Sequence, residues 1–143
     1  MPEITVSQTI NRPVFDVFPM FTQVEKLEQW QPDLQAAHQT DDRLRVGVMV
    51  TYVRNTRALG WQLDLNADIV DYVPNRLIGY KGIIGRFPTS GRIEFESSGS
   101  STTVTEIINV RMGFLFGLFS PLVKRALTRR TQNALNNLKM MME

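Results

Sequence analysis

The sequence predicts an α+β fold in which a seven-stranded antiparallel sheet wraps around a long C-terminal helix, with two short helices after the first strand. Three observations lead to this prediction. Apolar and polar residues alternate with a period of two through most of residues 34–112, as in half-buried strands. Prolines delimit a short apolar stretch after residue 12. A helical repeat occupies the last part of the chain, and it is the one element large enough to cover a single sheet.

The first strand and the two short helices follow from the N-terminal residues. Residues 3–11 alternate, with isoleucine and valine on one face and polar side chains on the other. Pro13 suits the first turn of a helix, and we expect Pro19 to kink or end that helix. A capping-box pattern at 22–25 predicts a second helix reaching about Trp30. The apolar face of the helical region is expected to contain Val14, Phe15, Val17, Phe18 and Phe21.

The remaining strands are separated by turn signals rich in glycine, proline, asparagine and serine. The short connections between them predict an antiparallel meander. The chain contains no repeat, low-complexity tract or linker, so we interpret residues 1–143 as a single domain. These strands are expected at 34–40, 46–57, 61–73, 76–84, 90–97 and 102–112.

The C-terminal helix is predicted from Ser120, as the N-cap, to about Met142. Arg130 falls within its apolar stripe, so a helix laid across the sheet would direct this cation inward. From Ser120 to the end, five basic residues against Glu143 give a charge of +4, while the rest of the chain sums to −2. We interpret them as a solvated face and expect no nucleic-acid partner. The predicted apolar stripe consists of Val123, Ala126, Leu127, Ala134, Leu138 and Met141.

Several classes of site are excluded by composition. The sequence has no cysteine, which excludes disulfides, thiolate nucleophiles and cysteine metal sites and fits a reducing compartment. His38 is the single histidine, so no histidine cluster exists, and no phosphate-binding glycine motif occurs. We expect no metal, no cofactor and no recognisable catalytic machinery. The N-terminus shows no secretory signal, and the longest apolar stretch, 112–123, is too short to cross a membrane, so we expect a cytoplasmic protein.

Glu106 is the anomaly of the last strand, because it lies in the middle of an otherwise apolar stripe. A buried carboxylate must be paired, protonated or hydrated. Two interpretations stay open. Glu106 pairs with Arg130, or either residue pairs with a neighbour such as Asp68 or Arg54, and the charges only fill the interior. Alternatively, one of them presents a charge or hydrogen bond to the polar head of a ligand.

The segment 113–119 places three phenylalanines between glycines, just before the C-terminal helix. Ordinary packing under the sheet edge is one interpretation. The others are a lid over a pocket mouth, a tip in transient contact with a membrane, or a dimer contact. The sequence does not specify the oligomeric state.

The chain resembles the START-like, helix-grip superfamily (SRPBCC), and within it the polyketide cyclase/dehydrase-like branch. The resemblance covers essentially the whole sequence. It rests on 13–18 after the first strand, on 27–32, on 46–48, on Trp61 with 69–77, on 91–95, on the turn at 100–105 and on the glycine-rich lead into the last helix.

This resemblance implies a cavity between the sheet and the C-terminal helix that holds a hydrophobic small molecule, such as a lipid, a quinone or a polyketide. The expected function is therefore binding or transport of such a ligand. The alternative is an enzyme of the cyclase/dehydratase type, in which Glu106 with Arg130 or Tyr52 would handle protons. We select the predicted ligand-binding residues from this resemblance and from the side chains expected to face the interior of the sheet. They are Tyr52, Arg54, Trp61, Leu63, Phe95, Glu106, Ile108, Phe116 and Arg130.

Overall fold

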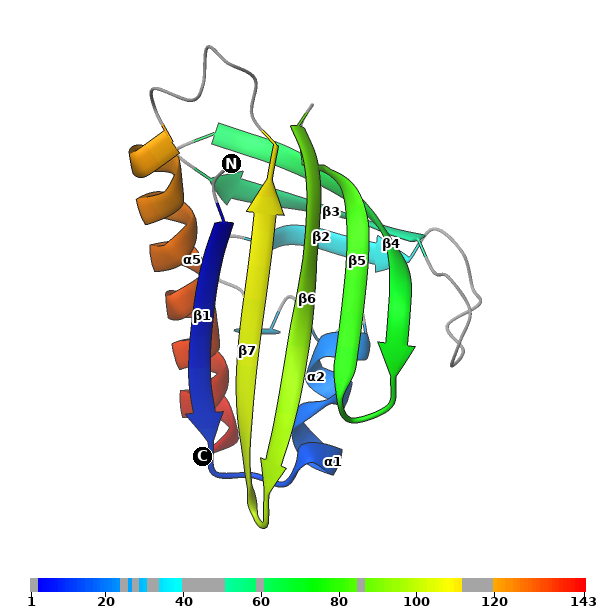
Figure 1. The fold of residues 1–143 in the computed structure, drawn as a ribbon, viewed down its shortest axis with the longest axis vertical. Coiled ribbons are helices and arrows are strands. Elements are labelled where there is room, and N and C mark those ends of the chain that lie inside the picture. Colours follow the sequence, from blue (N-terminus) through cyan, green and yellow to red (C-terminus); the bar gives the residue numbers. More distant parts are fainter. Residues whose placement is uncertain are drawn as a thin grey trace.

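The structure is a computed structural model, shown in Figure 1. It describes the backbone of residues 3–23, 26, 29–30, 34–39, 51–58, 61–84, 87–111 and 120–143. Side chains are described for 3–23, 26, 29–30, 69–83, 87–111, 121, 124–125 and 127–143. The predicted segment 113–119, and with it Phe116, lies outside these residues.

The described strands form one antiparallel sheet of seven strands, in the order β1-β7-β6-β5-β4-β3-β2. Six of them form a meander, and β1 joins the sheet beside β7, the last strand in the sequence (Figure 1). Asn75 and Gly99 adopt positive φ angles of 64° and 62° at two of the predicted turns. The strands are β1 (Glu3–Ile10), β2 (Leu34–Gln39), β3 (Thr51–Ala58), β4 (Trp61–Val73), β5 (Leu77–Ile84), β6 (Phe87–Ser98) and β7 (Ser101–Val110).

A β-bulge bends β4. Its register with β5 shifts between Ile69 and Asp71, so Val70 is the extra residue. Bulges increase the local bend and twist of a strand. In Figure 1, β3 and the first half of β4 run across the sheet, while the second half of β4 turns to follow β5. The sheet therefore curls, and α5 (Ser120–Met142) contacts both β1 and β3.

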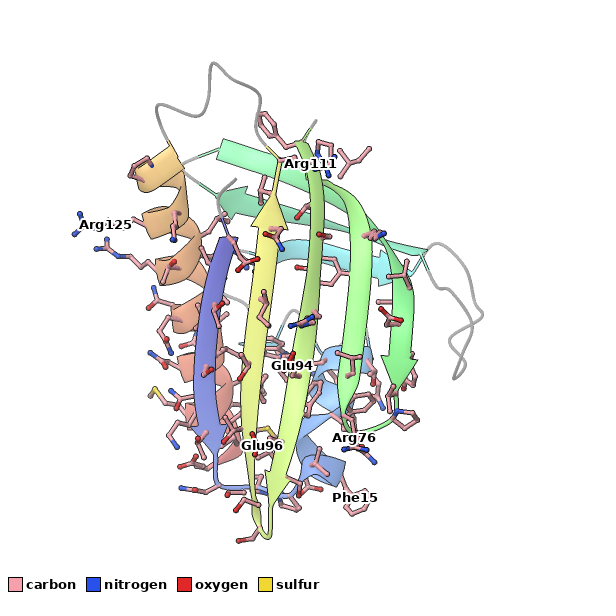
Figure 2. All side chains as sticks on the ribbon, viewed as in Figure 1. Phe15, Arg76, Glu94, Glu96, Arg111 and Arg125 are labelled. Atoms are coloured by element: carbon pink, nitrogen blue, oxygen red, sulfur yellow. The ribbon has the colours of Figure 1, made fainter. Side chains whose placement is uncertain are left out.

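Proline placement explains the short helices. Pro13 precedes α1 (Val14–Val17) with φ of −66°, and Pro19 ends α1 and begins α2 (Pro19–Thr22). Lys26, Gln29 and Trp30 are also helical. The expectation for Phe15 was wrong: its side chain is 75% exposed and projects away from the protein (Figure 2). Its neighbours Val14 and Val17 are buried, because a single helical turn can direct only one side toward the sheet.

The core lies on one face of the sheet, which we call the inner face. It carries buried side chains from alternate positions of the strands, including Ile4, Val6, Ile78, Phe95 and Val104. The helical aromatic residues cover one end of this face. Phe18 lies 4.9 Å from Phe95 between ring centroids, and the indole N–H of Trp30 donates a 3.0 Å hydrogen bond to the Met20 carbonyl. This end of the interior is filled by aromatic packing.

The predicted apolar stripe of α5 is confirmed at Ala134 and Leu138, which are buried, and is wrong at Met141. The most buried side chains are Thr131, Leu135 and Leu138, whereas Met141 is 46% exposed. Apolar residues cover a broad arc of this helix, so packing against the sheet decides which part of the arc is buried. Arg130 consequently lies at the edge of the buried stripe and is half-buried. Among the described helices, none is long and apolar enough to cross a membrane.

Candidate ligand-binding site

Glu106 lies on the inner face of the sheet. On one side its register partner is Val6 of β1, and on the other it is Ile93 of β6. Directly paired residues of antiparallel strands point to the same face, and Val6 is buried against the core. The Glu106 side chain is half-buried and has an interaction partner. A carboxylate thus stands within an otherwise apolar row of the interior.

Ile108 occupies the next row of the inner face and is partly buried against the core. Its row continues through Gly91 of β6 to Tyr80 of β5. Phe95 belongs to a different part of the face. It is 6% exposed and packs edge-to-face against Phe18 and Phe21. Of these predicted contacts, Glu106 and Ile108 are neighbours, while Phe95 lies in the aromatic end of the core.

Tyr80 is an inner-face residue that the sequence reasoning did not select. A Cβ atom added to Gly91 would lie only 2.6 Å from the Tyr80 hydroxyl oxygen and 2.8 Å from the Ile107 carbonyl oxygen. The ring of Tyr80 therefore crosses over Gly91, and its hydroxyl reaches the boundary between β6 and β7. Because Glu106 is one row away on the same face, both polar groups border the same region. The feature of the sequence that could have indicated this close approach is Gly91, a glycine within the apolar stripe of β6.

Arg130 approaches the row of Glu106 from the helix. Asn136 accepts a 2.7 Å hydrogen bond from Gln8, and the later residues of α5 bond to later residues of β1, so the two elements run parallel. Arg130 precedes Asn136 by six residues, so its position is about 9 Å nearer the N-terminal end of α5. On β1 this distance is between about two and three residues, so Arg130 lies level with the Thr5–Val6 step of the strand. Val6 is the register partner of Glu106.

The side chain of Arg130 leaves α5 on the flank that faces away from β1. Lys139 lies nine residues later, or two and a half turns, and its Nζ donates a 2.9 Å hydrogen bond to the Thr9 carbonyl of β1. Arg130 therefore occupies the opposite flank. Its Nε atom is buried, and the residue has an interaction partner. Glu106 on the sheet and Arg130 on the helix thus lie at about the same level along β1.

The other predicted ligand contacts are described only by their backbone. Tyr52 is the register partner of Ala67, and Arg54 that of Leu65, on adjacent strands β3 and β4. Ala67 in turn pairs with Gly82, and Gly82 with Thr89. The backbone ladder is therefore continuous from Tyr52 to β6. Trp61 and Leu63 pair with Ala58 and Thr56 at the far end of β4, and the side chains of all four predicted residues lie outside the described part of the chain.

The apolar interior changes the pKa of one tyrosine side chain. Burial raises the pKa of the Tyr72 phenol, which lies against Phe18 at a ring-centroid distance of 5.6 Å. The phenol therefore stays neutral over the physiological pH range.

Within the described residues, no cluster of three or more histidine, cysteine, aspartate or glutamate side chains could hold a metal ion.

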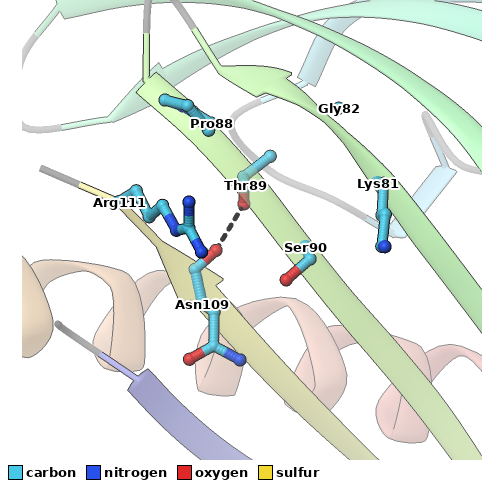
Figure 3. Close-up of a pocket in the computed structure, with 7 residues that line it drawn as sticks. All are labelled: Lys81, Gly82, Pro88, Thr89, Ser90, Asn109 and Arg111. Atoms are coloured by element: carbon cyan, nitrogen blue, oxygen red, sulfur yellow. Dashed lines mark hydrogen bonds between the residues drawn. The ribbon is translucent and has the colours of Figure 1, made fainter.

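Along the described residues of the opposite, outer face of the sheet lie two open depressions. One of about 460 Å³ lies along β5, β6 and β7 between Lys81 and Arg111 (Figure 3). The other, of about 370 Å³, continues from it past Gly79. The hydroxyl of Thr89 does not face a ligand there, because it donates a 2.8 Å hydrogen bond to the Asn109 carbonyl. These depressions are separated from Glu106 and Arg130 by the sheet itself.

A family model described as "Polyketide cyclase / dehydrase and lipid transport" matches residues 1–143. The chain belongs to this family.

Solved structures share the fold of this polyketide cyclase/dehydrase family member. A protein from Thermus thermophilus has a TM-score of 0.82 and 17% identity, over 97% of this chain and 95% of the other. The Zhui aromatase/cyclase from Streptomyces sp. R1128 has a TM-score of 0.78 and 13% identity, over 98% and 92%. A START superfamily protein from Mycobacterium smegmatis has a TM-score of 0.77 and 12% identity, over 98% and 96%. No curated protein matches the sequence.

These comparisons confirm the predicted family and the predicted fold class, an antiparallel sheet with a C-terminal helix in the helix-grip arrangement. At these identities the solved structures show the fold alone. The family description indicates a hydrophobic-ligand or cyclase role in general terms and does not select between them.

Proposed function

We propose that this protein binds or transports a hydrophobic small molecule, such as a lipid, a quinone or a polyketide, between the inner face of the sheet and α5. The observation that supports the proposal is that Glu106 and Arg130, two half-buried residues of opposite charge, lie at about the same level along β1. Apolar pockets with a few convergent polar groups are typical of small-molecule sites. The family description, which names polyketides and lipid transport, supports the same class of ligand.

In this proposal the apolar body of the ligand contacts the inner face, and its polar head is held by the charged residues. The aromatic end of the core around Phe95 and Phe18 closes one end of the site. Ile108 lies beside the polar groups. The proposed contacts are Tyr52, Arg54, Trp61, Leu63, Phe95, Glu106, Ile108, Phe116 and Arg130.

A cyclase/dehydratase activity is the second candidate. The observation that favours it is the position of the Tyr80 hydroxyl over Gly91, one row from Glu106. A phenol and a carboxylate that border the same region could transfer a proton to and from a substrate. A carrier needs the same groups only as hydrogen-bonding partners. The two candidates therefore share a site and differ in whether the bound molecule is changed.

The deciding experiment is native mass spectrometry of the purified protein, followed by denaturing extraction and identification of the bound molecule. Wild type is compared with Glu106→Gln and with the control Glu96→Gln, whose side chain is exposed on the outer face. We expect wild type and the control to retain an apolar ligand and Glu106→Gln to lose most of it. Equal ligand content in all three proteins would contradict a role for Glu106.

The same material separates the two candidate functions. The extracted molecule is returned to ligand-free protein, incubated and weighed again by mass spectrometry. Recovery of an unchanged mass supports binding or transport. Loss of one water molecule from the ligand with wild type, but not with Glu106→Gln, would support the dehydratase.

A further inference from the structure

Thr131 has a buried hydroxyl whose hydrogen bonds are not made. The residue is 1% exposed, and its Oγ1 atom has no hydrogen-bond partner in the described structure. Buried hydroxyl groups nearly always have a hydrogen-bond partner, because a hydroxyl that is removed from water and gains no new hydrogen bond raises the free energy of the folded state. A polar atom kept in this state inside a core calls for a physical reason.

The usual local solution is not used at this position. A threonine in a helix can donate to the carbonyl oxygen four residues earlier. Thr128, one turn away on the same helix, does so, with 2.7 Å between its Oγ1 and the Lys124 carbonyl oxygen. Thr131 makes no such bond to its own helix. Its hydroxyl therefore keeps its full capacity to donate and to accept.

Thr131 also lies at the level of the other polar groups. It precedes Asn136 by five residues, or about 7.5 Å of helix. Asn136 is bonded to Gln8 of β1. A point about 7.5 Å before Gln8 on β1 lies close to Val6, which is the register partner of Glu106. Leu135 and Leu138, on the same stripe of α5, are fully buried and apolar. The helix thus presents a hydroxyl and the adjacent Arg130 at the same level as the carboxylate of the sheet.

We infer that the Thr131 hydroxyl binds the ligand by donating a hydrogen bond to a carbonyl or carboxylate oxygen. This inference rests on the proposed function. An oxygen acceptor is favoured because the guanidinium of Arg130 follows directly in the helix and attracts negative charge or the negative end of a carbonyl dipole. Among the described residues of α5, the buried neighbours Leu135 and Leu138 are apolar and do not compensate for burying the Thr131 hydroxyl.

The test uses probes that differ in their oxygen chemistry. N-phenyl-1-naphthylamine is an apolar fluorophore without an acceptor oxygen, and it reports on the interior by its fluorescence. Decanoate and decan-2-one compete with it and carry a carboxylate and a carbonyl. Each affinity is measured for wild type, for Thr131→Val, which replaces the hydroxyl by a methyl group of similar size, and for Thr131→Ser, which keeps it. Thr128→Val is the control, since its hydroxyl is already bonded to Lys124.

We expect Thr131→Val to bind the fluorophore as wild type does, within about twofold, and to bind decanoate or decan-2-one about tenfold more weakly, as for one lost hydrogen bond. An effect on decanoate alone assigns a carboxylate ligand, and an effect on both assigns a carbonyl group in general. Thr131→Ser and Thr128→Val should keep wild-type affinity for both. The thermal midpoint of Thr131→Val should equal or exceed that of wild type, because an unpaired buried hydroxyl is removed.

Unchanged affinity of Thr131→Val for both oxygen-bearing probes would overturn the inference while leaving the proposed function standing. Equal weakening for the fluorophore and the competitors would also overturn it, since this outcome indicates a change of shape and not of hydrogen bonding. Failure of wild type to bind the fluorophore or either competitor would overturn the proposed function and the inference together.

Discussion

Gln8 of β1 donates a 2.7 Å hydrogen bond from its Nε2 atom to Oδ1 of Asn136 on α5. These residues are 128 positions apart in the sequence, and their bond shows where the helix lies along the strand. Further contacts toward the end of the helix keep the same order, including the bond from the Arg12 guanidinium to the Met142 carbonyl. The helix cannot slide along β1 without breaking them. This fixed level is what brings Arg130 and Thr131 opposite the row of Glu106.

The aromatic end of the core should be essential to stability, while its exposed neighbour should not. Phe18 is 5% exposed and packs on Tyr72 and Phe95, whereas Phe15 is 75% exposed. We expect Phe18→Ala to lower the free energy of unfolding by about 3–5 kcal/mol. Phe15→Ala should change it by less than about 0.5 kcal/mol. Denaturant unfolding of both variants measures this, and similar losses would show that the buried face of α1 is wrongly assigned.

Glu106 and Arg130 should be energetically coupled. Both are half-buried at one level of the interior, so each single substitution should cost less than the about 3–5 kcal/mol of a fully buried pair. We expect the double variant Glu106→Gln/Arg130→Met to lose less stability than the sum of the single variants, with a coupling of about 0.5–3 kcal/mol. Chemical denaturation of the four proteins completes the cycle. Strict additivity would mean that the two residues act separately.

Stability at acid pH should depend on Glu143. Hydrogen bonds from Lys139 and from the backbone amide of Asn11 lower the pKa of the Glu143 carboxyl from its usual 4.5. A lowered pKa in the folded state means that the unfolded chain binds the proton more readily. The stabilisation is therefore present above pH 4.5 and is lost as the pH falls through the lowered value.

The measurement is the thermal midpoint of wild type and of Glu143→Gln between about pH 6 and pH 3. Wild type should be the more stable protein at the upper end, and the difference should shrink toward the lower end. Lys139→Met removes the main cause of the pKa shift and should also flatten the dependence. A difference that stays constant across this range would contradict the assignment.

Much of the fold was determined by local sequence pattern. The period of two in the last strand placed Glu106 on the same face as Val104 and Ile108, and the register with Val6 agrees with that placement. Ser120-Pro121 predicted where α5 begins, and Pro19 predicted where α1 ends. These features are decided by residues close to one another in the chain, through side-chain alternation, capping and the loss of a backbone donor.

The tertiary structure decided what depends on contacts between distant elements. Apolar residues span a wide arc of α5, and only packing against β1 and β3 buries Thr131 and Leu135 and exposes Met141. The position of Tyr80 over Gly91 requires two strands to be in register, so neither residue alone reveals it. The sequence by itself placed Glu106 on the inner face, whereas it did not determine that Arg130 lies at the edge of the buried stripe of α5. Their common level was decided by the packing of α5 on the sheet, and the bond between Gln8 and Asn136 marks that alignment, because helix and strand advance by different distances per residue.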